Sequence, residues 1–231
     1  MAKLSGSCHG LKNILRTVRE KMGKIRDYFS AIGKSFLVWR TPSPLTDADA
    51  LAVFCLQRAI YVAQTALYGY LRTRAGLQHF NLFTDKKFTA VLKPARSRLV
   101  LVCLDDLVVY AAAILPELSA QRRATLATRL FAHGIAALQD EALLQEELRS
   151  AQADFERRSH LIDWAARAAP DKGIAAFRKS AEALIELAPI VDALKKYDNE
   201  IVINSMHFKW LGVRTQLRER LDAHALLASL A

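Results

Sequence analysis

The stretch 48-ADALAVFCLQRAIYVAQTALYGYLRTR-74 is the strongest indicator of the fold, because its apolar residues cover nearly every side of a helix. The isolated Arg58 is the one charge between Asp49 and Arg72. A helix that is apolar nearly all round is buried on most sides. We therefore predict a central helix over residues 48–74, with Thr46 as its N-cap and with Asp47 and Asp49 in its first turn.

The sequence after this stretch predicts further helices. Residues 76–96 hold turn residues and scattered aromatics, which favours a packed loop with, at most, a short extended pair. Apolar spacing predicts a helix over 98–115 that ends at Pro116. It predicts a second helix over 119–138, with Ser119 as its N-cap, and a third over 141–168. Residues 174–188 follow, and Pro189 restarts or kinks the chain before a terminal helix. The predicted inner faces carry Leu126, Leu130, Phe131, Leu144, Leu148, Ala151, Phe155, Ile162, Phe177, Ala181, Leu184, Leu187, Met206, Trp210, Val213, Leu217 and Leu221.

The composition agrees with an all-α fold. Only nine glycines and six prolines occur in 231 residues, 52% are hydrophobic, and 24% are charged, as in an ordinary globular protein. We predict an all-α multi-helix bundle over residues 45–231 as a single domain, a proline-containing connector over 41–44, and a basic amphipathic helical arm over 1–40.

No apolar run reaches the roughly 18 to 20 uncharged residues of a membrane span. The closest run, 99–115, is interrupted by Asp105 and Asp106. Residues 1–40 lack the apolar core of a secretory signal, although they share the Arg-rich character of a transit peptide. Cys8, Cys55 and Cys103 form no CxxC pair, and the latter two lie among apolar residues, so we expect reduced core thiols and a reducing compartment.

The arm has the most distinctive charge pattern. Its first 40 residues hold nine Lys or Arg and two acids, so +7 of the net charge of +10 lies there and +3 in the rest. Apolar residues recur at alternating steps of four and three, which places them on one helix face: Leu11, Leu15, Val18, Met22, Ile25, Phe29, Ile32 and Phe36. Basic residues fill the remaining faces: Lys12, Arg16, Arg19, Lys21, Lys24, Arg26 and Lys34.

Three interpretations of this arm compete. The apolar seam packs onto its own domain, binds a protein partner or a second copy as a coiled coil, or lies on an anionic membrane surface. Phe29, Phe36 and Trp39 near one end favour the membrane. Residues of the seam and its basic flanks are the candidate partner- or membrane-binding residues: Leu11, Lys12, Leu15, Arg16, Val18, Arg19, Met22, Lys24, Ile25, Phe29 and Phe36.

Asp105 and Asp106 form a candidate buried polar site with Arg58. Adjacent helix residues point about 100° apart, so we expect at most one of the aspartates to face the core squarely. A buried carboxylate must be paired or neutralised, and Arg58 in the other apolar helix is the expected partner, with Arg72 and Arg74 as alternatives. The competing interpretation is an acid poised for proton chemistry or a cation.

Other chemistry finds little support in the sequence. Glu156 and His160, four residues apart, fit an ordinary helix pair, and no Glu-x-x-His or His-x-x-x-His occurs, so we predict no metal site. No phosphate loop, GxSxG or haem-attachment motif is present, so we assign no catalytic residue and no cofactor. For nucleic acid, the candidate basic positions are Arg122, Arg123, Arg129, Lys209, Arg214, Arg218 and Arg220.

The function that the sequence favours is non-enzymatic: a cytoplasmic helical interaction protein, an adaptor or assembly factor. It would dock through its basic arm onto an acidic protein partner or, as a peripheral protein, onto an anionic membrane. The first alternative is an enzyme or small-ligand binder with a pocket around Arg58, Asp105 and Asp106. The second is a nucleic-acid binder. The sequence leaves the oligomeric state open.

Overall fold

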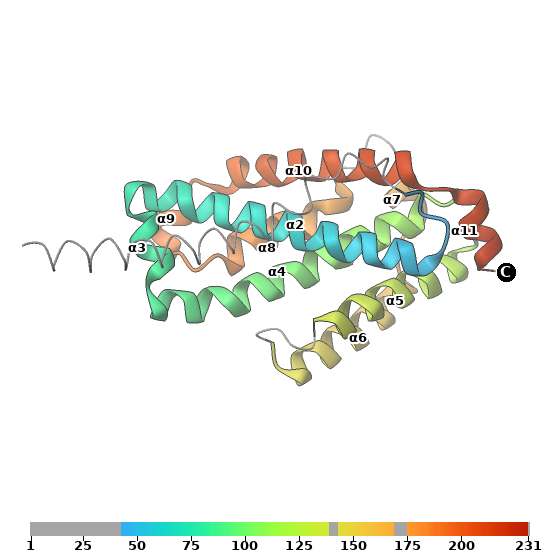
Figure 1. The fold of residues 1–231 in the computed structure, drawn as a ribbon, viewed down its shortest axis with the longest axis horizontal. Helices are drawn as coiled ribbons and strands as arrows, with labels where there is room; N and C mark the ends of the chain where they lie inside the picture. The colour runs from blue at the N-terminus through green and yellow to red at the C-terminus, as the bar shows by residue number, and fades with distance from the viewer. Residues whose placement is uncertain (1–42, 139–142, 169–174, 231) are drawn as a thin grey trace, which may run out of the picture. The chain divides into compact units, whose positions relative to one another are not determined.

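The computed structural model describes residues 43–138, 143–168 and 175–230, and this part of the chain is all-α, as predicted (Figure 1). The helices are α2 (Ala48–Ala75), α3 (His79–Thr84), α4 (Lys86–Ala113), α5 (Ala120–Ala137), α6 (Gln145–Ser159), α7 (Trp164–Ala168), α8 (Arg178–Leu187), α9 (Asp192–Lys195), α10 (Asn199–Arg220) and α11 (Ala223–Ser229). Short 3-10 turns, η1 (Gly76–Gln78) and η2 (Ala175–Phe177), precede α3 and α8.

The chain divides into two units, Met1–Pro42 and Ser43–Ala231, at a point inside the predicted connector. The predicted basic arm, with all of its seam and flanking residues, lies outside the described residues. Its helical form and its partner therefore stay predictions.

The bundle is built around α4. Helices α2 and α4 are joined by η1 and α3 and run antiparallel as neighbours (Figure 1). Helix α5 packs on both, α8 packs on α4, α10 packs on α2 and α8, and α6 covers α5. From Leu99 to Ala113 almost every side chain of α4 is buried, whereas α2 keeps an outward side on which Val53 is 43% exposed. The most enclosed helix is therefore α4, while α2, predicted to be central, packs on α4, α5 and α10.

Helix α2 also contains the segment that most resembles a membrane span. Within Ala48–Thr84 one window has a mean hydropathy of 1.4, and length and composition would allow it to cross a bilayer. Half of that window is buried inside the bundle, as in the core helix of a globular domain. The closest match to a span is therefore this segment rather than residues 99–115.

The predicted loop over residues 76–96 is wrong, because this region is helical. Asp85 caps α4 by accepting hydrogen bonds from the backbone N–H groups of Lys87 (2.6 Å) and Phe88 (3.0 Å). Pro94 lies inside α4 and removes one backbone donor. Leu92 and Ala95 beside it are buried, and this packing keeps the helix continuous through the proline.

Other helix ends show where local signals succeed and fail. The Ser119 side chain accepts from the N–H of Arg122 (3.3 Å), so the predicted cap of α5 is confirmed. The cap of α2 is Asp47, which accepts from the N–H of Ala50 (2.8 Å), so the prediction of Thr46 is wrong. The helix predicted over 141–168 is two helices, because Asp163 accepts from the N–H of Ala166 (3.1 Å) and begins α7.

The two ends of the described bundle are tied together. The N–H of Leu45 donates to the carbonyl of Arg220 (2.7 Å), and the N–H of Asp222 donates to the carbonyl of Leu45 (3.2 Å). The side chain of Leu45 is 2% exposed. The segment that precedes α2 is thus part of the core.

Candidate functional site

Asp105, in the middle of α4, is held by two cations from other helices. Its Oδ2 accepts from Arg158 Nη2 of α6 (2.7 Å) and from Lys179 Nζ of α8. The carboxylate side chain is 7% exposed, whereas the Arg158 and Lys179 side chains are 41% and 51% exposed. Arg158 also lies over the Phe155 ring, 5.4 Å from its centroid. The ion pairs of Asp105 therefore connect a buried carboxylate with two partly exposed cations.

Asp106, in contrast to Asp105, is held by a hydrogen bond from the backbone and by no ion pair among the described residues. Its Oδ2 accepts from the backbone N–H of Ser180 (2.8 Å), and the hydroxyl of Ser180 accepts from Trp210 Nε1 (3.0 Å) and donates to the carbonyl of Phe177 (3.0 Å). Phe177 and Trp210 stack on each other with their centroids 4.4 Å apart. The polar atoms of three helices thus close on one another beneath an aromatic stack.

The two aspartates are both 5% exposed, so the expectation that only one would face the core is wrong. Burial and the charge of Asp105 together raise the pKa of Asp106 to about 7, against the lowering effect of its Ser180 hydrogen bond and of the Lys179 charge. Burial, with the charge of Asp106, raises the pKa of the Cys103 thiol well above its usual range. Cys55 and Cys103 are both buried free cysteines, as predicted. This cluster can take up a proton near neutral pH, but Cys103 is no thiolate nucleophile.

Arg58 does not join this cluster. Its guanidinium lies over the Phe54 ring, 5.6 Å from the centroid, and Arg220 of α10 lies over the same ring at 5.2 Å. Burial and the charge of Arg220 lower the pKa of Arg58, and its Nε is buried without a hydrogen-bond partner among the described residues. The predicted pairing of Arg58 with Asp105 or Asp106 is therefore wrong; of the alternatives, Arg74 pairs with Asp198 (2.7 Å).

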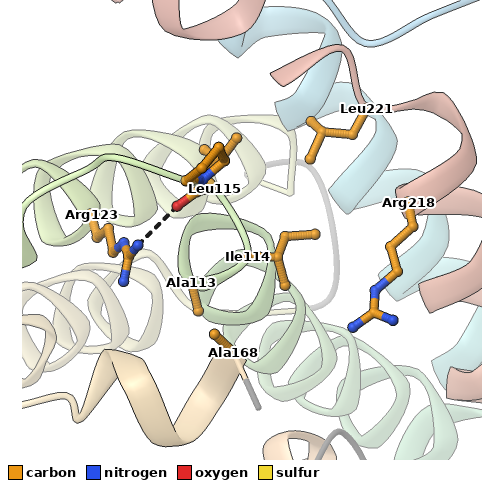
Figure 2. Close-up of a pocket in the computed structure, with 8 residues that line it drawn as sticks. Ala113, Ile114, Leu115, Arg123, Ala168, Arg218 and Leu221 are labelled. Carbon is orange, nitrogen blue, oxygen red and sulfur yellow. Dashed lines mark hydrogen bonds between the residues drawn. The ribbon is translucent and has the colours of Figure 1, made fainter. Parts of the chain in front are cut away.

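A surface pocket of about 410 Å³ lies at the C-terminal end of α4 (Figure 2). Arg123 borders it on one side, with Nη2 donating to the carbonyl of Leu115 (2.8 Å), and Arg218 of α10 reaches toward it from the other side. Its remaining lining is mostly apolar: Ala113, Ile114, Leu115, Pro116, Ala168 and Leu221. Among the described residues that line it, there is no carboxylate, thiol or imidazole that could form an acid–base pair. A second pocket, of about 540 Å³, is bounded by Gln78, Asn81, Leu82, Asp85, Lys87, Phe88 and Val91. Arg58, Asp105 and Asp106 line neither pocket.

Several of the candidate nucleic-acid arginines bind the protein itself. Arg122 donates to the carbonyl of Leu230 (3.2 Å), and Arg129 pairs with Asp49 (2.9 Å). Arg214 donates to the Tyr110 hydroxyl (3.3 Å), and Arg220 donates to the carbonyl of Ser43 (3.1 Å). Burial lowers the pKa of Lys209. These contacts place most of the basic side chains of α5 and α10 in structural roles.

Glu156 and His160, which the sequence suggested as a helix pair, are both exposed at the end of α6. Among the residues that the structure describes, no three His, Cys, Asp or Glu side chains gather where they could hold a metal ion.

Sequence reasoning missed Arg158, Lys179, Ser180 and Trp210 as members of the buried cluster. One signal was available for Ser180, because it lies three residues after Phe177 and four before Leu184, on the apolar face of α8. A small polar residue in such a face must find a partner. No comparable signal marks Arg158 or Lys179, because half-exposed cations resemble solvated ones.

The fold and its polar cluster define an all-α bundle whose core carboxylates are satisfied from within. In comparisons with known proteins, no protein-family model, curated protein or solved structure matches the chain.

Proposed function

We propose that this chain is a non-enzymatic helical interaction protein, an adaptor or assembly factor, that docks through its basic residues 1–40 onto an acidic protein partner. The observation that carries the proposal is the distribution of positive charge. The first 40 residues carry +7 of the +10, while arginines of the bundle bind its own oxygens, as Arg122, Arg123 and Arg158 do. Attraction to an anionic partner would therefore be strongest at the arm.

A charge reversal within the arm tests this proposal. Replacing Lys12, Arg16, Arg19 and Lys24 by Glu should abolish partner binding while helix content stays unchanged, and raised salt should weaken binding of the unaltered chain. Affinity purification with the full chain, the variant and a chain that begins at Pro42 should yield one set of partners with the full chain alone. Unaltered binding by the variant would contradict the proposal.

The matched control reverses four exposed lysines of the bundle, Lys86, Lys87, Lys93 and Lys196. Both variants change the net charge by −8, from +10 to +2. If the control binds normally and the arm variant does not, the location of the charge matters rather than its sum. Equal losses in both variants would point instead to non-specific attraction by the net charge.

An anionic membrane is the second candidate for the arm, favoured by Phe29, Phe36 and Trp39 in its sequence. Vesicles of phosphatidylserine and phosphatidylcholine, compared with phosphatidylcholine alone, separate it from a protein partner. Co-sedimentation with the anionic vesicles, lost in the arm variant, would favour the membrane.

The enzymatic alternative around Asp105 and Asp106 has one observation in its favour, the pKa of Asp106 near 7. Against it, Asp105 is paired with two cations and Asp106 with Ser180. The nucleic-acid alternative is weakened by the internal contacts of Arg122, Arg129 and Arg220.

A further inference from the structure

One end of the bundle presents exposed apolar side chains. Helix α3 crosses this end, between the last turn of α2 and the first turn of α4 (Figure 1). Leu77 of η1 is 96% exposed, Phe80 of α3 64% and Val91 of α4 57%. We call residues 72–93 the hairpin end, because they join α2 to α4. Large apolar side chains that are exposed together are typical of an interaction surface.

The hairpin end is a packed element with a hollow in its surface. Phe83 of α3 contacts the rings of Tyr68 in α2 and Phe88 in α4, with centroids 5.5 and 6.3 Å apart. Helix α3 is thereby held against both long helices, so the exposed side chains beside it have a fixed base. The pocket of about 540 Å³ lies here and is bounded by Gln78, Asn81, Leu82, Asp85, Lys87, Phe88 and Val91.

Positive charge is concentrated at the same place. Residues 72–93 hold five Lys or Arg and one acid, Asp85, which gives +4. Residues 41–231 carry +3 in total, so the remainder of them sums to −1. Arg74 pairs with Asp198 (2.7 Å). The other four cations are exposed and form no ion pair with another residue in the described part of the chain: Arg72, Lys86, Lys87 and Lys93.

These four cations flank the exposed apolar residues on both sides. Arg72 lies in the last turn of α2, and Lys86 and Lys87 begin α4. Lys93 is seven residues after Lys86, about 10 Å further along the helix at 1.5 Å per residue. An interfacial segment sinks its apolar face by a similar depth, about 5 to 10 Å, into a bilayer. Cations behind an apolar tip can then reach the lipid phosphates.

We propose that the hairpin end binds the surface of an anionic phospholipid bilayer. Leu77 and Phe80 insert among the headgroups, and Arg72, Lys86, Lys87 and Lys93 contact the lipid phosphates. This binding concerns a different part of the chain from residues 1–40 and does not depend on the docking of the arm.

Charge and composition select this occupant over three others. The arm, at +7, and the hairpin end of a second copy, at +4, would both be repelled by the same charge. An acidic protein would meet the charge, but protein interfaces are depleted in lysine, and three of the four unpaired cations are lysines. Lysines interleaved with exposed apolar residues are instead typical of membrane-surface segments.

Co-sedimentation of the full chain with vesicles tests the apolar part of the surface. The unaltered chain should sediment with vesicles of phosphatidylserine and phosphatidylcholine, and far less with phosphatidylcholine alone. Leu77→Ser combined with Phe80→Ser should weaken binding to the anionic vesicles about tenfold or more, with unchanged helix content by circular dichroism. The matched control is Leu144→Ser combined with Leu161→Ser, at residues 72% and 82% exposed at the two ends of α6, and it should bind normally. Normal binding by the hairpin-end variant, or equal binding to phosphatidylcholine alone, would overturn the proposal.

A charge reversal tests the basic part. Changing Lys86, Lys87 and Lys93 to Glu should weaken binding to the anionic vesicles by at least about a hundredfold, because each cation near such a surface contributes several-fold to affinity. The matched control changes three exposed arginines of α6 and α8 to Glu: Arg149, Arg157 and Arg178. Both variants lower the net charge from +10 to +4. Equal losses in the two variants would show that only the net charge matters and would refute a site at the hairpin end.

The arm variant separates this proposal from the proposed function. With Lys12, Arg16, Arg19 and Lys24 changed to Glu, the full chain should still sediment with the anionic vesicles, whereas both hairpin-end variants should still capture the protein partners of the arm. Vesicle binding that is lost in the arm variant and kept in the hairpin-end variants would place the membrane at the arm instead. An unaltered chain that binds polyglutamate but not the anionic vesicles would make an acidic polypeptide the occupant, against the proposal.

Discussion

Asp105 and Asp106 are adjacent in the chain and are both buried, but their carboxylates have different kinds of partner. Asp105 stays between two cations, Arg158 and Lys179, whereas Asp106 accepts from the backbone N–H of Ser180 and has a raised pKa. A buried carboxylate without an opposite charge is costly. The folded state therefore holds a proton on Asp106 more tightly than the unfolded chain does.

Asp106→Asn should remove a pH-dependent loss of stability. The pKa of Asp106 is about 7 in the folded chain against an ordinary 3.8, so its stabilising protonation is complete below pH 3.8 and is lost as the pH rises through 7. Relative to the variant, the unaltered protein should lose on the order of 4 kcal/mol between pH 4 and pH 8. Urea unfolding of both proteins across this range measures the difference. Parallel stability profiles would contradict it.

Asp105→Ala should reduce the free energy of unfolding by about 1 to 3 kcal/mol. The cost stays below that of a fully buried charge, because Arg158 and Lys179 are half-exposed and can turn to solvent. A double-mutant cycle with Lys179→Met should show coupling, and one with Arg58→Met should be additive. Coupling to Arg58 alone would restore the pairing predicted from the sequence. Glu147→Ala, which breaks the surface pair with Arg98, should cost less than about 1 kcal/mol.

At the scale of single helices, the first residues determine where each begins. Asp47 accepts from the N–H of Ala50 at the start of α2, while the Thr46 hydroxyl makes only a long contact with the Asp47 side chain (3.5 Å). Asp47→Ala should lower the free energy of unfolding by about 1 kcal/mol, the usual cost of a lost N-cap. Thr46→Ala is the matched control and should change it by less than about 0.5 kcal/mol. Thermal melts decide between them, and equal losses would show that both residues cap the helix.

At the scale of the whole molecule, the segment before α2 closes the bundle at the end of α10. A chain that begins at Pro42 keeps the hydrogen bonds of Leu45 with Arg220 and Asp222, so it should remain helical and unfold cooperatively. A chain that begins at Ala48 loses them together with the buried Leu45 side chain, and should be less stable by about 2 to 4 kcal/mol. Circular dichroism melts compare the two. An aggregated protein that begins at Pro42 would show that residues 1–41 are needed to close the core.

The amino-acid sequence alone predicted the fold class and most of the buried helix faces. Leu126 and Leu130 of α5, and Met206 and Trp210 of α10, are buried as their spacing predicts, because helical periodicity and capping depend on residues within about four positions. The same locality explains the false loop over 76–96, where Pro94 is overridden by the packing of α4. The partners of Asp105 follow from helix packing instead, because they lie 53 and 74 residues away along the chain. The angle and offset at which α4, α6 and α8 pack determine which cations reach that carboxylate, and neither quantity is written in the spacing of one helix.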